Sequence, residues 1–130
     1  MNGYLEMRPL RIFVVEDHID TLKCLKLYLE SLGHTVLTAQ TVAEALAELP
    51  SANCEVLISD IGLPDGTGWE LLEKARLPRP IYAIAMSGFS FNDASIRSHS
   101  VGYRHHLLKP FTPVELKNIL VEAAREVTPL

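Results

Sequence analysis

The chain has 130 residues, a net charge of −4, 48% hydrophobic residues and 22% charged residues. This length allows one domain with a full core that needs neither disulfides nor a structural metal. The acidic balance does not indicate a nucleic-acid surface, and no apolar run reaches the roughly 20 residues of a membrane helix. Because the first ten residues contain no signal-peptide core, we expect a cytoplasmic protein in which Cys24 and Cys54 are reduced core thiols.

The first third of the chain alternates strand and helix patterns. A strand is predicted at Arg11–Val15. A leucine at every third or fourth position of Leu22–Leu32 then predicts a helix that ends at Gly33. The second strand is predicted at Thr35–Ala39, and the Thr-x-x-Glu sequence of Thr41–Glu44 is typical of a capping box that starts the second helix.

The middle of the chain continues this alternation. The apolar run Val56–Ser59 predicts a third strand, buried on both faces. A short third helix is expected around Trp69–Ala75 and is expected to end at Leu77-Pro78. The run Ile81–Ser87 predicts the fourth strand.

The last third contains one weak helix and one strong helix. The segment Ser90–Ser100 has only Ala94 and Ile96 as apolar residues in its middle, so we expect its helix to pack weakly and to move most easily. The fifth strand is predicted at Tyr103–Leu108. The final helix has the best start signal in the chain, because Thr112–Glu115 combines a cap residue, a proline and a glutamate.

Strand and helix therefore alternate five times. This alternation predicts an α/β fold with a parallel sheet, right-handed crossovers and helices on both faces. We expect one domain over residues 11–127, with a leader at 1–10 and a tail at 128–130.

Four of the predicted strands end in polar residues. Glu16 and Asp17 follow the first strand, Asp60 follows the third, Ser87 ends the fourth and Lys109 follows the fifth. Open α/β folds place their chemistry at the carboxyl edge of the sheet. Carboxylates about 4 Å apart repel by roughly 4 kcal/mol at an effective dielectric of about 20, so protonation or a hard divalent cation must offset the repulsion. Such oxygen ligands suit Mg²⁺ shared with a phosphate group, whose oxygens a lysine ammonium can contact.

Each of these residues also has a simpler interpretation. Asp17 would cap the first helix, Asp60 would belong to a turn, and Lys109 would be solvated. Ser87 and Gly88 would form a plain turn, whereas in a site the hydroxyl donates to a phosphoryl oxygen and the glycine leaves room for its approach. The joint arrival of these residues at neighbouring strand ends favours the site.

The order and spacing of these motifs resemble the receiver domain of response regulators in two-component phosphorelays. The resemblance covers about residues 11–127 and includes the loop Leu63–Gly68 and the pair Lys109-Pro110. The segment Gly102–Pro110 is most similar to receivers of hybrid histidine kinases. The resemblance implies a flavodoxin-like fold, a doubly wound five-stranded parallel sheet of order 2-1-3-4-5 with five helices.

The resemblance also implies roles for the strand-end residues. Asp60 would accept a phosphoryl group from a phosphohistidine of a histidine kinase or a histidine phosphotransfer protein, and Lys109 and Ser87 would contact that group. The implied ligands of Mg²⁺ are Asp17, Asp60, the carbonyl of Gly62 and, through water, Glu16.

The implied switch couples Ser87 to His106 and rearranges the face of the fourth helix, fifth strand and fifth helix. His106 stands where the family usually has Tyr or Phe. It is smaller and titrates near neutral pH, so a packed strand histidine and a pH-dependent role are alternatives. Arg104-His105 replaces the acidic pair of many DNA-binding regulators, so we expect a monomer or weak dimer without direct nucleic-acid binding.

Gly88 and Phe89 are predicted to shape access to the phosphoryl group. The resemblance implies that Gly62 and Phe89 flank the path of a hydrolytic water, and neither residue has a side chain that can hold a water. We therefore expect slow self-catalysed dephosphorylation, over minutes or longer, and no other enzyme activity. In the alternative, Phe89 packs under the fourth helix and leaves this path open.

Other functions are compatible with the same architecture. An aspartyl phosphatase would need a second aspartate two residues after Asp60, where Gly62 stands. A nucleotide or flavin site would need GxGxxG after the first strand or GxxxxGK[ST], and the sequence contains neither. An interaction module independent of phosphorylation is the main alternative, although the intact Asp17, Asp60, Ser87 and Lys109 count against it.

Overall fold

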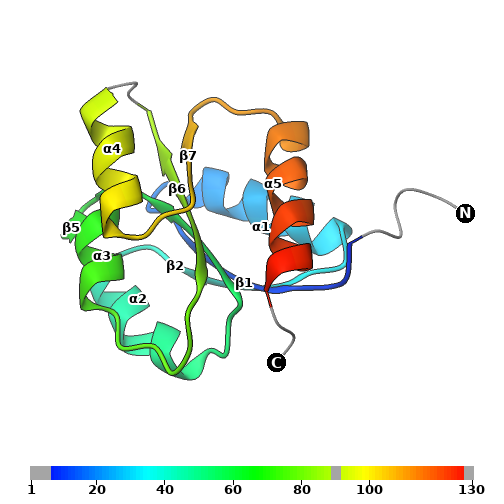
Figure 1. The fold of residues 1–130 in the computed structure, drawn as a ribbon, viewed down its shortest axis with the longest axis horizontal. Helices are drawn as coiled ribbons and strands as arrows, with labels where there is room; N and C mark the ends of the chain where they lie inside the picture. Colours follow the sequence, from blue (N-terminus) through cyan, green and yellow to red (C-terminus); the bar gives the residue numbers. More distant parts are fainter. Residues whose placement is uncertain (1–6, 89–91, 128–130) are drawn as a thin grey trace, which may run out of the picture.

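The computed structural model describes residues 7–88 and 92–127, in which one five-stranded sheet organises the fold (Figure 1). Its strands are β1 (Arg11–Val15), β2 (Thr35–Ala39), β3 (Val56–Asp60), β6 (Tyr82–Ser87) and β7 (His105–Leu108). All neighbouring pairs are parallel, in the order β2-β1-β3-β6-β7. Counted as five strands along the chain, this is the 2-1-3-4-5 order, so the predicted flavodoxin-like α/β fold is confirmed.

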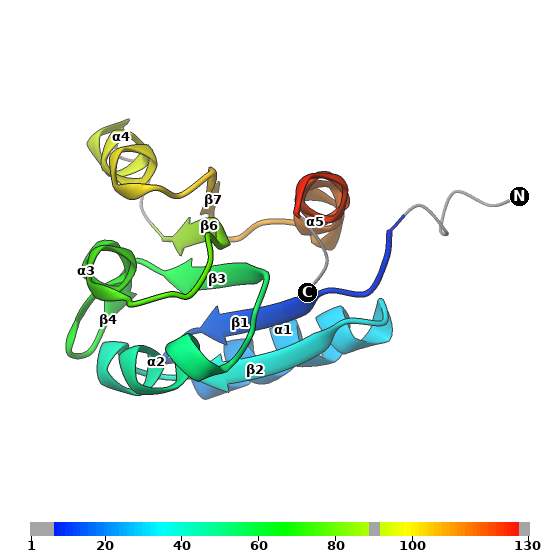
Figure 2. The ribbon, with the colours of Figure 1, turned by 60° about the horizontal axis from the view of Figure 1, so that its bottom comes forward.

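Helices cover both faces of this sheet (Figure 2). They are α1 (Ile19–Ser31), α2 (Val42–Glu48), α3 (Gly68–Lys74), α4 (Asn92–Val101) and α5 (Pro113–Glu126). Ile12 and Val14 of β1 belong to the core cluster that includes residues of α1 and α5, whereas Phe13 and Val15 belong to the cluster that includes residues of α2 and α3. Alternate side chains of a strand point to opposite faces, so a strand covered on both sides requires a continuous apolar run. None of the described helices is long and apolar enough to cross a membrane.

The register of the strands brings their carboxyl ends to one edge of the sheet. Asp60 of β3 pairs with Met86 of β6, and Ser87 pairs with Leu108 of β7. Since neighbouring parallel strands run in step, the polar residues that end or follow them gather at this edge.

The predicted helix starts are largely confirmed. At α5, Thr112 and Glu115 form a complete capping box, with each side chain accepting from the other residue's backbone N–H. At α2, Thr41 Oγ1 accepts from the backbone N–H of Glu44. The Glu44 side chain accepts from the backbone N–H of Gln40 and, at 3.4 Å, from the Thr41 hydroxyl, but not from the backbone N–H of Thr41. The box at α2 is therefore half formed.

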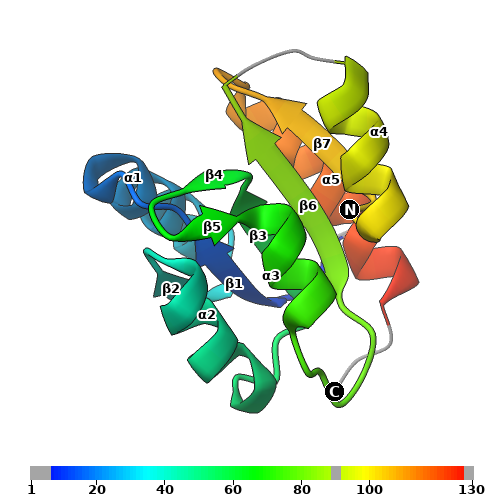
Figure 3. The ribbon, with the colours of Figure 1, turned by 90° about the vertical axis from the view of Figure 1, so that its left-hand side faces the viewer.

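Three local features depart from the prediction. Gly62–Leu63 (β4) and Gly66–Thr67 (β5) form a short antiparallel pair beside α3 (Figure 3). A 3-10 turn, η2 (Leu49–Ser51), follows α2, and α3 ends at Lys74, before the expected stop at Pro78. Two-residue strands and a single turn are too short to produce a periodic pattern.

One predicted burial assignment, that of Cys24, is wrong, and α4 packs through small residues. Both thiols are free, but Cys24 is exposed on α1 while Cys54 is buried. On α4, Ile96 is 66% exposed, and the small residues Ala94 and Ser98 face the protein. These two lie four residues apart and so share one side of the helix. The helix contacts its neighbours through this small pair and, at its last residue, through Val101.

Gly68 occupies a crowded position where α3 begins, and its substitution is expected to destabilise the protein. A Cβ atom there would lie 2.5 Å from the backbone oxygen of Asp60 and 3.1 Å from Ser59 Oγ. The backbone is also fixed, because the Gly68 N–H donates to Ile61 O at 2.9 Å and Gly68 O accepts from the Tyr103 hydroxyl at 2.6 Å. We expect Gly68→Ala to lower the free energy of unfolding by about 2–4 kcal/mol in urea melts.

Gly62→Ala is the matched control, because a Cβ at Gly62 would meet no atom of residues 7–88 and 92–127 within 4 Å. We expect this control to change stability by about 0.5 kcal/mol or less. Equal stability of the two variants would contradict the close approach at Gly68.

Candidate functional site

Three carboxylates meet at the carboxyl edge of the sheet. Asp60 is the last residue of β3 and is 8% exposed, Glu16 follows β1 and is 1% exposed, and Asp17 beside it is exposed. One oxygen of each lies within 4.8 Å of the others. The structure thus brings together the acidic residues that the sequence predicts at strand ends.

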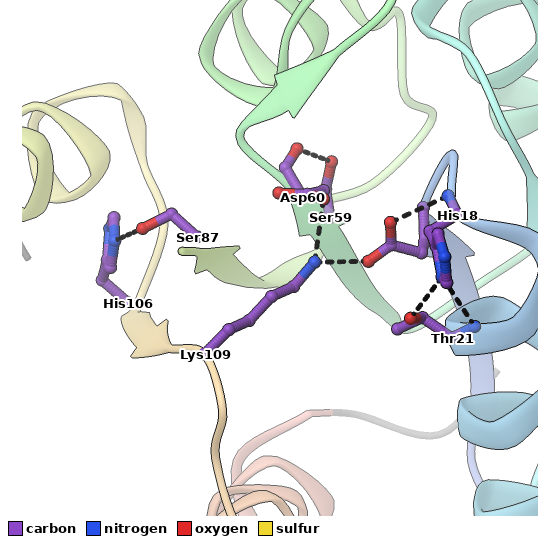
Figure 4. Close-up of polar contacts among 8 residues, drawn as sticks. His18, Thr21, Ser59, Asp60, Ser87, His106 and Lys109 are labelled. Atoms are coloured by element: carbon purple, nitrogen blue, oxygen red, sulfur yellow. Dashed lines mark hydrogen bonds and ion pairs between the residues drawn. The ribbon is translucent and has the colours of Figure 1, made fainter. Parts of the chain in front are cut away.

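Asp17 is not the cap of the first helix, so that simpler interpretation is wrong. His18 is the N-cap of α1, and its Nδ1 accepts from the backbone N–H of Thr21 at 3.4 Å. The same nitrogen also lies 2.8 Å from Thr21 Oγ1, within hydrogen-bond distance (Figure 4). The other simple interpretation, with Asp60 in a turn, is also excluded, because Asp60 belongs to a strand.

Lys109 supplies the cation of the site. It follows β7 and precedes a cis peptide bond to Pro110, and its backbone N–H donates to Ser87 O at 2.7 Å. Its ammonium donates to Glu16 Oε1 at 2.5 Å and to Asp60 Oδ2 at 2.9 Å, and so lies between the two buried carboxylates (Figure 4). The simpler interpretation of a solvated lysine is therefore wrong.

The buried carboxylates respond differently to this environment. Burial raises the pKa of Asp60, and the bond from Lys109 opposes that rise only in part. Burial also acts to raise the pKa of Glu16, but the hydrogen bonds from Lys109 and from the His18 backbone N–H outweigh it, and the pKa falls. These two bonds occupy one oxygen each of Glu16. Of these two buried carboxylates, Asp60 is the one whose negative charge is not fully stabilised by its hydrogen-bond partners.

The donor set fits Mg²⁺. Three carboxylates face one ammonium, which leaves an excess of negative charge that a hard divalent cation with oxygen ligands would neutralise. Asp17 and Asp60 are the available direct ligands. Both carboxylate oxygens of Glu16 already accept hydrogen bonds, which suits its predicted role of holding the metal through a water molecule. The Gly62 backbone is exposed beside Asp60, and its carbonyl remains a predicted ligand.

Ser87, the last residue of β6, and His106, in β7, lie side by side. Ser87 is buried, and its Oγ is 2.7 Å from His106 Nε2. On the other side of the ring, His106 Nδ1 is 2.8 Å from Ser98 Oγ, which accepts from Trp69 Nε1 at 2.9 Å. Burial and the nearby His99 lower the pKa of His106, so its neutral form predominates at neutral pH.

Sequence reasoning missed Ser98 and Trp69 as neighbours of this site. The available signal was the spacing of Ala94 and Ser98, which places a hydroxyl on the packed side of α4. Of the residues predicted to shape phosphoryl access, Gly88 is exposed, and a Cβ there would meet no atom of the described residues within 4 Å. Phe89 lies outside the described residues.

Comparison with known proteins identifies the family. A family model described as the response regulator receiver domain matches residues 12–121. An uncharacterised 14.6 kDa protein of Leptolyngbya boryana is 35% identical over 111 residues, which are 81% of this chain and 82% of that protein. The KDP operon transcriptional regulatory protein KdpE of Escherichia coli is 32% identical over 114 residues, covering 88% of this chain and 51% of KdpE. The chain therefore spans about half the length of KdpE.

Solved structures agree with the family model. A CheY-like response regulator receiver domain protein from Methanospirillum hungatei is 34% identical with a TM-score of 0.81, covering 92% of this chain and 99% of the other. A two-component response regulator from Clostridium difficile has a TM-score of 0.85 at 23% identity, covering 90% of this chain and 97% of the other, and shows the shared fold. With its five-stranded sheet and its strand-end carboxylates, this chain belongs to the response-regulator receiver domains of two-component systems.

Proposed function

We propose that this receiver accepts a phosphoryl group on Asp60 from a phosphohistidine. The observation that carries the proposal is the convergence of Glu16, Asp17, Asp60 and Lys109 at neighbouring strand ends. A nucleophilic carboxylate, oxygen ligands for a divalent cation and an ammonium are the groups that phosphoryl transfer to an aspartate requires.

The chemistry follows from these groups. An oxygen of Asp60 attacks phosphorus and forms an acyl phosphate, while the phosphorus–nitrogen bond of the donor breaks and its electron pair stays on the histidine nitrogen. Lys109, already 2.9 Å from Asp60, neutralises charge on the transferred oxygens, and the Ser87 hydroxyl contacts one of them. Bound Mg²⁺ supplies further positive charge at these oxygens. Asp17, Asp60 and the Gly62 carbonyl would hold it.

We propose that the α4–β7–α5 face is the surface through which phosphorylation changes the binding of a partner. Each of these elements has one exposed large apolar side chain, Ile96 on α4, Leu108 on β7 and Val114 on α5. These side chains would supply apolar area for a contact with a protein partner. A rearrangement of Ser87 and His106 on phosphorylation would change this face, since His106 belongs to β7 and contacts α4 through Ser98.

The proposed donor is a histidine kinase or a histidine phosphotransfer protein. An apolar groove of about 630 Å³ between α1 and the start of α5 includes Lys109 in its wall, together with Cys24, Tyr28 and Phe111. A protein that delivers a phosphoryl group to Asp60 therefore has an apolar surface to bind beside the acceptor. The monomeric or weakly dimeric state, the absence of direct nucleic-acid binding and the likeness of the β7 segment to hybrid-kinase receivers stay predictions.

Intact mass spectrometry tests the proposal. After incubation with acetyl phosphate and Mg²⁺, we expect one added phosphoryl group per chain, which hydroxylamine removes and a chelator of Mg²⁺ prevents. No added mass would support an interaction module independent of phosphorylation, and steady turnover of a phosphate ester would support a phosphatase.

A further inference from the structure

A chain of hydrogen bonds runs from the candidate phosphorylation site to the α3–α4 side of the molecule. It joins Ser87 of β6, His106 of β7, Ser98 of α4 and Trp69 of α3, with heavy-atom distances of 2.7, 2.8 and 2.9 Å. Figure 4 shows the first link, with His106 on the side of Ser87 away from the strand bearing Asp60. Four elements thus contribute one polar side chain each to a continuous line.

The direction of these bonds follows from the donors available. The indole N–H of Trp69 can only donate, so Ser98 Oγ is an acceptor in that bond. Ser98 is 0% exposed, and among the described residues its hydroxyl has Trp69 and His106 as its two partners. A buried hydroxyl hydrogen needs an acceptor, and the one remaining here is His106 Nδ1. Ser98 therefore donates to His106.

This bond determines where His106 carries its own hydrogen. A neutral imidazole that accepts at Nδ1 has its hydrogen on Nε2. That nitrogen lies 2.7 Å from Ser87 Oγ, so the ring donates and the serine oxygen accepts. The hydroxyl hydrogen of Ser87 consequently cannot point at His106. Burial and the neighbouring His99 lower the pKa of His106, which favours the neutral ring that this arrangement requires.

We propose that His106, oriented by Ser98 and Trp69, is a positioning residue that presents the Ser87 hydroxyl as a hydrogen-bond donor to the phosphoryl group on Asp60. A donor fixed in direction before the reaction stabilises developing charge without reorganisation. This role rests on the proposed function of Asp60. It predicts that a change at Ser98, far from the acceptor in sequence, alters both the tautomer of His106 and the rate of phosphorylation.

The tautomer provides a readout that a merely structural role would not change. In the wild-type protein, ring ¹⁵N shifts of His106 should show one predominant tautomer with hydrogen on Nε2. Ser98→Ala removes the donor to Nδ1, and we expect a mixture of both tautomers. Ser100→Ala is the control, because Ser100 is exposed on the same helix and should leave the His106 signals unchanged.

Kinetics provide the second readout. With acetyl phosphate and Mg²⁺, Ser98→Ala should slow phosphorylation about three- to tenfold, whereas Ser100→Ala should stay within about twofold of wild type. In a Ser87→Ala background, Ser98→Ala should have no further effect, because the relay acts through that hydroxyl.

The outcomes separate this role from the proposed function. A wild-type protein that takes up no phosphoryl group overturns both. Three outcomes, each with normal phosphoryl uptake by the wild type, overturn the positioning role and leave the acceptor assignment intact. These are hydrogen on Nδ1 of His106, an unchanged rate in Ser98→Ala, and equal effects of Ser98→Ala with and without Ser87.

Discussion

Replacement of Asp60 by Asn is expected to abolish phosphorylation and leave the fold intact. The amide retains the size of the side chain but is not a nucleophile for phosphorus. Intact mass after incubation with acetyl phosphate and Mg²⁺ should therefore change from one added phosphoryl group per chain to none. Asp20→Asn is the control, since Asp20 lies exposed in the first turn of α1, and it should be phosphorylated like the wild type.

The same variant has an expected effect on stability that depends on pH. Burial, opposed by the bond from Lys109, raises the pKa of Asp60, so the folded protein holds a proton there more tightly than the unfolded chain does. Above the pKa that Asp60 has in the folded protein, its ionised carboxylate therefore destabilises the fold. This destabilisation disappears as the pH falls below the pKa of the same carboxyl in the unfolded chain. In a chelator at pH 7, Asp60→Asn should melt at a higher temperature than the wild type, and the difference should shrink at acidic pH.

Phosphate uptake by the Asn variant at the normal rate and stoichiometry would show that another residue is the acceptor. A lower melting temperature at pH 7 would show that Lys109 compensates the Asp60 charge fully.

The sequence could predict the sheet and the strand-end site because both depend on local patterns. Apolar runs such as Val56–Ser59 mark buried strands, and Thr112 with Glu115 marks a helix start through contacts three residues apart. Parallel strands then gather their carboxyl ends without further information. Asp60 and Lys109 could therefore be placed together from order alone.

The remaining details depend on contacts between distant segments. Asp65 in the β4–β5 turn accepts from the backbone N–H groups of Val42 and Ala43, so the start of α2 is stabilised by a residue more than 20 positions away. The orientation of Ser98 depends on where α4 lies against α3 and β7. No pattern within either segment contains that information.

The removal of Lys109 is expected to have two opposite effects at the site. Its ammonium lies 2.5 Å from Glu16 Oε1 and 2.9 Å from Asp60 Oδ2, and so occupies oxygen atoms near the place where Mg²⁺ would bind. Without this cation, the three carboxylates repel one another more strongly and attract Mg²⁺ more strongly. We expect wild-type Mg²⁺ binding in the millimolar to submillimolar range, about 4–5 kcal/mol, and binding about tenfold tighter in Lys109→Ala.

Phosphorylation should change in the other direction. Lys109 is the one ammonium among the described residues bonded to Asp60, and the charge that develops on the transferred oxygens loses this compensation in the variant. We expect the rate with acetyl phosphate to fall about 100-fold or more, even at saturating Mg²⁺. Amide shifts in a Mg²⁺ titration measure the affinity, and intact mass against time measures the rate.

Lys26→Ala is the matched control for the loss of a paired lysine. Lys26 bonds Glu30 at 2.7 Å, but both side chains are about two-fifths exposed, at 42% and 41%, and they lie on the outer side of α1. This variant should keep both the Mg²⁺ affinity and the phosphorylation rate of the wild type. If Lys109→Ala instead binds Mg²⁺ with wild-type affinity, the ammonium does not compete with the metal for these carboxylates. If the affinity rises and the rate is unchanged, Lys109 restrains the empty site and takes no part in transfer.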